Sequence, residues 1–192
     1  MRYELSTAAT ASPVTITEAV DHLRVADESE YAKIQWLIEM ATRWVERRIE
    51  RQLCTATWKL YLDAFPSEIE LRKLPVASVT SITYIDADGD EQTLASTVYQ
   101  TEFTSEDRPG RIKLDYGQVW PSTRSGEYNA VTVTFTCGYG AAAAVPTTIK
   151  QAILMLMNHW FDNPGAVSPI TLSPVPFSVD ALLSSEEWGS YA

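Results

Sequence analysis

The sequence has few of the side chains from which most catalytic and metal-binding sites are built. Its 192 residues include only two histidines, His22 and His159, and two cysteines, Cys54 and Cys137. The cysteines lie far apart and form no CxxC pair, so the spacing of a zinc site or of a redox motif is absent. We therefore expect two buried free thiols, two structural or surface histidines, and no bound metal or cofactor.

The motifs of the common enzyme classes are absent as well. The pair Gly138 and Gly140 lacks the third glycine of a dinucleotide fingerprint and the Lys-Ser or Lys-Thr of a phosphate loop. No GxSxG segment supplies the nucleophile of a hydrolase of that type. Asp86, Asp88 and Asp90 alternate as in a calcium loop, but the remaining ligands are missing, so this segment predicts a hairpin turn. We identify no catalytic residue and predict that the protein is not an enzyme.

Basic residues and long apolar runs are also scarce. The chain has 15 Lys plus Arg against 25 Asp plus Glu, a formal net charge of −10. It therefore repels DNA on average, because affinity for nucleic acid comes from neutralising phosphates. An acidic surface does suit a conduit through which DNA slides without sticking. No stretch reaches the roughly 18 apolar residues that span a bilayer. The polar start does not resemble a signal peptide, so we expect a soluble protein made in the cytoplasm.

Two amphipathic helices are the strongest structural signals that the sequence does contain. Apolar residues recur at spacings of three and four: Tyr31, Ile34, Ile38, Ala41, Val45, Ile49 and Leu53. This stripe, widened by Leu37, Met40 and Trp44, predicts a helix near 28–53. A second stripe predicts a helix near 147–162: Ile149, Ile153, Leu156 and Trp160. We expect Ile38 and Trp44 to be needed for folding or for packing between subunits.

Residues 57–144 change to alternating patterns rich in β-branched and aromatic residues. They predict a small antiparallel β-domain of five to seven strands: 57–62, 69–71, 79–86, 93–94, 98–99, 111–114 and 131–137. The predicted fold class is α+β, with the β-rich insertion 57–144 between the two parts of a helical body, 14–56 and 145–163. Residues 1–13 are polar and rich in Ala, Thr and Ser, and we expect a flexible segment there.

The tail, residues 164–192, combines prolines with apolar side chains. Four prolines prevent a long helix: Pro164, Pro169, Pro174 and Pro176. Only residues 179–183 hint at a short helix. The apolar residues are too many for a solvated linker, so we predict an extended C-terminal docking arm that a partner orders. The contact candidates on the arm are Phe177, Leu182, Leu183 and Trp188. The alternative is a tail that packs back onto its own β-domain.

Short segments spread over the chain, taken together, carry a resemblance to a known family. They are residues 14–25, 41–49, 57–66, 74–86, 109–112, 120–121, 131–135, 138–140, 145–146, 149–154 and 179–183. In this order and spacing they resemble the head–tail connector, or adaptor, proteins of tailed bacteriophages. The chain departs from that pattern at its end, because it continues through residues 184–192 where such proteins often stop soon after the Leu-Leu pair.

The resemblance implies a structural subunit of the virion. Connector proteins of this kind form a ring, here expected to be a dodecamer, beneath the portal at the capsid vertex. The ring extends the DNA channel and offers a platform for a stopper or tail-completion protein. The implied partners are further copies of the chain, the portal and that completion protein. DNA passes through without sequence-specific binding, and no membrane takes part.

Two other classes of function stay open on the residues alone. One is a phage-encoded module that binds glycans or a receptor through Trp58 and Trp120 on the β-domain. The other is a small hydrolase whose site leaves no recognisable motif. A stable ring in a mass measurement favours the adaptor. Glycan binding by a monomer favours the binding module, and turnover of an ester or glycoside favours the hydrolase.

Overall fold

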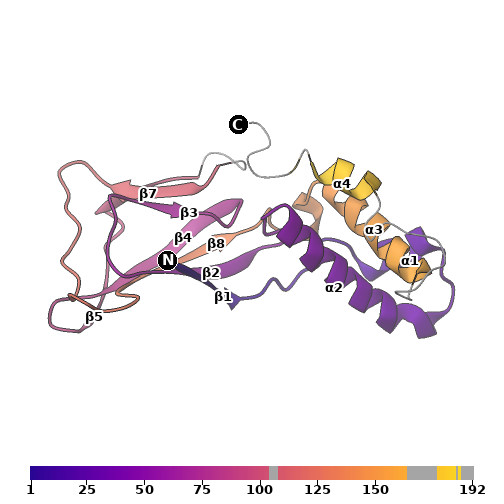
Figure 1. Cartoon of the computed structure of the whole chain (residues 1–192), viewed down its shortest axis with the longest axis horizontal. Helices are drawn as coiled ribbons and strands as arrows, with labels where there is room; N and C mark the ends of the chain where they lie inside the picture. Colours follow the sequence, from indigo (N-terminus) through magenta and orange to yellow (C-terminus); the bar gives the residue numbers. More distant parts are fainter. Residues whose placement is uncertain (104–107, 164–176, 185, 187–192) are drawn as a thin grey trace. The chain divides into compact units, whose positions relative to one another are not determined.

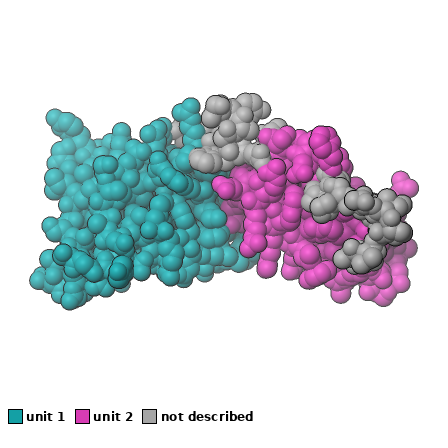
Figure 2. Space-filling model, in the orientation of Figure 1, with its two compact units in different colours: residues 1–10, 55–139 teal, residues 11–54, 140–192 magenta. Residues whose placement is uncertain are grey.

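The computed structural model describes residues 1–103, 108–163, 177–184 and 186 (Figure 1). Helices and antiparallel sheets are both present, so the predicted α+β class is confirmed. The chain divides into two compact units. Unit 1 consists of residues 1–10 and 55–139, and unit 2 of residues 11–54 and 140–192 (Figure 2). Unit 1 carries the sheets and unit 2 the helices.

Unit 2 is a helical unit built around two long helices. Its α-helices are α1 (Ile16–Leu23), α2 (Tyr31–Arg48), α3 (Thr147–Asp162) and α4 (Phe177–Leu183), with 3₁₀ helices η1 (Glu28–Glu30) and η2 (Ala142–Ala144). Helix α2 packs on α3, α1 packs on both, and α4 packs on α3. The two predicted stripes meet in one core, which buries Ile34, Ile38, Val45, Ile149 and Ile153. Burial of such a side chain stabilises a fold by about 1.5–3 kcal/mol.

Helix α2 ends earlier than the predicted boundary of residue 53. Glu50 takes a left-handed backbone with φ of 55°, and the Arg51 N–H donates to the Glu46 carbonyl over 3.1 Å. This six-residue closure terminates a helix by satisfying its last carbonyls. The Glu46 carboxylate also accepts from the Leu53 N–H over 3.0 Å, which fixes the chain just after the turn. Leu53 is buried as the stripe predicts, but from a segment outside the helix.

Unit 1 contains eight described strands in two antiparallel sheets. The larger sheet has the order β1-β2-β8-β4-β5, from strands β1 (Arg2–Thr7), β2 (Ala56–Leu62), β8 (Val131–Cys137), β4 (Val76–Ile85) and β5 (Glu91–Thr93). The smaller has the order β3-β7-β6, from β3 (Glu68–Leu71), β7 (Gly110–Leu114) and β6 (Tyr99–Glu102). Alternate residues of β8 are buried, as its period of two predicts. The core of the unit includes Leu60, Ile69, Ile82, Ile112 and Phe135.

The structure differs from the sequence expectation at both ends of the chain. Residues 2–7, expected within a flexible segment, form strand β1 and pair antiparallel with β2. In the tail, expected to be extended, residues 177–183 form α4, and both Val179 and Leu183 are fully buried. The rest of the predicted arm, residues 164–176, 185 and 187–192, lies outside the described residues.

Candidate assembly interface

The acidic turn at residues 86–90 is a structural turn between β4 and β5. The Asp86 Oδ1 accepts the backbone N–H groups of Asp88, Gly89 and Asp90 over 3.0–3.1 Å, and its Oδ2 accepts from Gln92 over 2.9 Å. These hydrogen bonds, that of Gln92 first, lower the pKa of Asp86. Both carboxylate oxygens are therefore engaged in holding the hairpin, as the sequence predicts.

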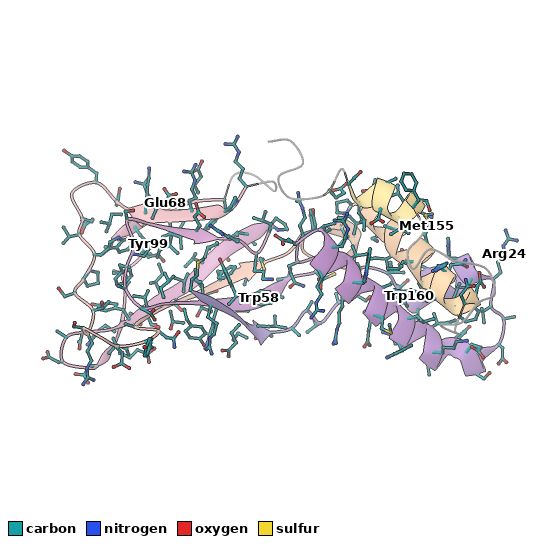
Figure 3. The ribbon with its side chains drawn as sticks, viewed as in Figure 1. Arg24, Trp58, Glu68, Tyr99, Met155 and Trp160 are labelled. Carbon is teal, nitrogen blue, oxygen red and sulfur yellow. The ribbon has the colours of Figure 1, made fainter. Side chains whose placement is uncertain are left out.

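The two histidines come together in a way that their sequence spacing does not reveal. His22 on α1 and His159 on α3 line one shallow depression of about 270 Å³ with Asp162 and with Met155, which is labelled in Figure 3. Within the part of the chain that the structure describes, no three His, Cys, Asp or Glu side chains could hold a metal ion. Among the described residues, the depression is therefore a small surface recess without a metal-binding cluster.

Both cysteines are buried and neither forms a disulfide, as predicted. Burial raises the pKa of the Cys54 thiol, and the nearby Glu46 carboxylate raises it further. A thiol with a raised pKa is a poor nucleophile, because the thiolate is the reactive form. Cys54 thus contributes apolar packing to unit 2, and Cys137 packs in the core of unit 1.

The outer side of the small sheet is polar and carries compensating charges. Arg111 on β7 lies 3.6 Å from Glu68 on β3 and 3.3 Å from Glu102 on β6. Together with Lys113 they border a depression of about 380 Å³. Glu68 is labelled in Figure 3. Exposed ion pairs of this kind contribute little to stability. Cross-strand alternation of acid and base indicates a solvated sheet face.

Trp58 and Trp120, the residues expected to bind glycans in the alternative function, are both engaged inside unit 1. The Lys73 Nζ lies 4.6 Å from the ring centroid of Trp58. The Trp120 ring stacks on Phe65, with centroids 4.7 Å apart and planes within 5°. Both rings are also partly buried and pack against the core of unit 1. The arrangement favours a packing role for both.

The six predicted contact residues fall into four groups. Ile38 and Leu183 are fully buried in the core of unit 2, so in the folded subunit they stabilise its own packing and offer no surface to a partner. Trp44 and Leu182 are partly buried. Phe177 is 86% exposed and remains a contact candidate. Trp188 lies outside the described residues.

Sequence reasoning missed the apolar side chains that the structure exposes. In unit 2 this is Trp36, which is 58% exposed on the outward side of α2; Met40, expected within the apolar stripe, is 36% exposed. In unit 1, Tyr116, Val119 and Tyr128 protrude from the segment between β7 and β8. The signal for Trp36 was its position off the apolar stripe, which places it opposite the core.

The segment after α4 is tied to the rest of unit 2. Arg51, only 4% exposed, donates its Nε–H to the Glu186 carbonyl over 2.8 Å. The Thr148 hydroxyl at the start of α3 donates to the Glu186 carboxylate, also over 2.8 Å. Arg48 on α2 adds an ion pair with Asp180 on α4 at 3.4 Å. Three elements therefore hold the described part of the tail in place.

Comparison with known proteins favours the structural role among the alternatives. Residues 14–171 match the head completion protein family. The chain belongs to this family. The match spans both units and covers the two long helices and seven of the eight described strands. It confirms the resemblance to phage head–tail connector proteins and identifies a structural role.

Chains in three solved structures of particles are similar to this chain over almost its whole length. A chain in the neck of an empty gene transfer agent (GTA) particle, computed with C6 symmetry, is 25% identical with a TM-score of 0.79, covering 97% of this chain and 95% of that chain. A chain of the native GTA virion is 26% identical with the same TM-score and coverage. A chain in the native GTA neck, computed with C12 symmetry, is 25% identical with a TM-score of 0.73 and the same coverage. No curated protein matches the chain.

The family and these matches identify a structural virion protein of the head–tail interface. None of the helices within the described residues is long and apolar enough to cross a membrane.

Proposed function

We propose that this head completion protein is an adaptor subunit that forms a ring beneath the portal, extends the DNA channel and joins the capsid to tail components. The observation that carries the proposal is the alignment of 97% of the chain with chains from the necks of GTA particles. Because this alignment spans both units, the whole chain is accounted for by one structural role. The portal and a stopper or tail-completion protein are the proposed partners.

The symmetry of the similar structures supports a closed ring. One neck was computed with C12 symmetry and the other with C6, and a dodecamer satisfies both. In a cyclic ring each copy contacts its two neighbours through two different faces. A subunit of this kind needs complementary surfaces and no active site, which agrees with the engaged carboxylates of the 86–90 turn.

The charge of the chain supports a channel for DNA. Each copy carries a formal charge of −10, so a ring concentrates negative charge around its axis. DNA in such a channel is repelled by the wall on average and slides without sequence-specific contacts.

Deleting the gene in a strain that produces particles tests the proposal. We expect DNA-filled heads without tails, and restoration of tailed particles when the intact gene is supplied. Electron microscopy of the restored particles, with this chain carrying a density label, should show the label at one vertex only. Normal tailed particles from the deletion strain, or label spread over the capsid, would overturn the proposal.

A further inference from the structure

The outward side of α2 carries side chains that the packing of unit 2 leaves unused. Trp36 is 58% exposed and Met40 36% exposed. Arg43 and Arg47 are also exposed. Spacings of four, three and four residues bring these side chains onto one side of the helix. We call this set, Trp36, Met40, Arg43 and Arg47, the α2 outer face.

The two arginines of the outer face lack, within the described part of the chain, the partners that other basic side chains of α2 have. Lys33 pairs with Glu30 at 3.1 Å and its Nζ lies 4.2 Å from the Phe161 ring centroid, so it is engaged within the unit. Arg48 pairs with Asp180. Arg43 and Arg47, by contrast, have no ion-pair partner among the residues that the structure describes.

The composition of the outer face is that of a protein interface. Single exposed apolar side chains are common on any protein and indicate nothing by themselves. Here a tryptophan and a methionine lie one helical turn apart beside two arginines. Tryptophan, methionine and arginine are the residue types enriched at interface cores, and tryptophan and arginine dominate binding hot spots. A solvated helix face is instead rich in Lys and Glu.

The same unit carries acids that complement the outer face. Asp21 on α1, and Asp27 and Glu28 at η1, are exposed. None of the three has an ion pair with a described residue. The chain has 25 acidic and 15 basic residues, so the surface of another copy is acidic on average. Such a surface has the charge that complements a face with these two arginines. A ring supplies that copy, because its contacts join one face of a subunit to a different face of the next.

We propose that the α2 outer face binds the neighbouring copy in the ring, with Trp36 and Met40 as the apolar centre and the arginines facing the neighbour's residues 21–28. The inference rests on the proposed function, since it assigns the contact that closes the ring. The arginine–carboxylate pairs at its edge set the register and speed up association, and salt screens them.

Site-specific photo-crosslinking identifies the occupant directly. A photoreactive amino acid replaces Met40 in the full chain, and particles are assembled in producing cells and irradiated. We expect a covalent product of two copies of this chain, with the attachment point in residues 21–28. A product with a different virion protein, or one joined to another region of the neighbour, overturns the assignment.

Variants of the outer face test its contribution to assembly. Trp36→Ser, and the double change Arg43→Glu with Arg47→Glu, should each keep the melting temperature of the parent. Each should weaken association between copies by about thirty-fold or more, the effect of losing a hot-spot side chain, and so lower the number of copies per particle. The matched control is Arg108→Glu with Arg124→Glu, two exposed arginines of unit 1 whose exchange changes the net charge equally. This control should assemble as the parent does.

Charge exchange separates this inference from the proposed function. Adding Asp21→Arg and Glu28→Arg to the arginine double variant should restore the copies per particle. Asp27 is left unchanged because its carboxylate accepts the Ser29 N–H over 2.9 Å. If the parent joins the neck and the face variants join it equally well, the inference fails while the function stands. If the parent itself is absent from the neck, both fail.

Discussion

The hydroxyl of Tyr3 on β1 accepts the backbone N–H of Arg72 over 2.9 Å and donates to the Glu70 carbonyl over 3.1 Å. It thereby joins the edge of the five-stranded sheet to β3 of the three-stranded sheet. Burial raises the pKa of Tyr3, so its hydroxyl stays protonated and keeps the donated bond. The N-terminal strand thus connects the two sheets of unit 1.

Tyr3→Phe is expected to destabilise the chain by about 1–3 kcal/mol, because it removes two hydrogen bonds worth about 0.5–1.5 kcal/mol each. Its ring keeps the edge-to-face contact with Phe135, so the loss reports the hydroxyl alone. Urea unfolding followed by circular dichroism measures the change. The control is Tyr128→Phe, whose side chain is 83% exposed. Equal unfolding free energies for both variants would show that the two sheets are held by apolar packing only.

Gly110 at the start of β7 marks a second close approach within unit 1. A Cβ at this position lies 2.8 Å from the Phe103 ring and 2.9 Å from a Val76 methyl, closer than such atoms approach. Gly110→Ala should therefore cost about 1–3 kcal/mol through overpacking. Urea unfolding measures this loss. Val76→Ala and Phe103→Leu together remove the clashing atoms. In that background Gly110→Ala should lower the free energy of unfolding by less than it does in the parent. A cost at 110 that is the same in both backgrounds would contradict the steric cause.

The sequence predicted the helices and most strands because each buries one face of a regular period. It did not predict β1, since a single short alternation of Tyr3 and Leu5 is weak without its partner β2. Nor did it reveal that Ile69 and Ile112 belong to a separate three-stranded sheet, because strand order depends on pairings distant in sequence. The end of α2 was misplaced because a left-handed Glu50, and not a glycine, closes the helix.

The candidate interface was harder to predict than the fold. Ile38 and Leu183 were chosen for being apolar, and that same property places them in the core. Trp36 was overlooked because it lies off the stripe, and Met40, expected to widen the stripe, is 36% exposed. Apolar periodicity indicates what a subunit buries by itself, whereas a partner surface consists of the apolar residues that break the period.

The capping box of α1 gives the chain a pH-dependent contribution to stability. Glu18 accepts the Thr15 N–H over 2.7 Å and the Thr15 hydroxyl over 2.8 Å, and these bonds lower the pKa of Glu18 below its usual 4.5. A lowered folded-state pKa means stability that is present above the unfolded-state pKa and lost as the pH falls through the folded-state pKa.

Glu18→Gln removes the charge that titrates in this contribution. We expect it to cost about 0.3–1 kcal/mol at pH 7, the usual effect of a carboxylate in the first turn of a helix. The difference from the parent should shrink below pH 4.5 as Glu18 becomes protonated. Urea unfolding at a series of pH values from 7 to 3 measures it, and a difference that does not vary with pH would contradict the assignment.

Helix α4 should stabilise unit 2 in the free subunit, whatever partner meets its exposed side. Leu183 is fully buried against the rest of the unit, so Leu183→Ala should cost about 2–5 kcal/mol through lost contacts and a cavity. Phe177 on the same helix is 86% exposed, and Phe177→Ala should stay within about 0.5 kcal/mol of the parent. Thermal unfolding of the two purified variants measures this pair of effects. If the outer side of α4 binds a partner, the Phe177→Ala protein should have the melting temperature of the parent but be present in fewer copies per particle. If instead Leu183→Ala melts like the parent, α4 contributes nothing to the free subunit, and the extended arm expected from the sequence describes the tail better.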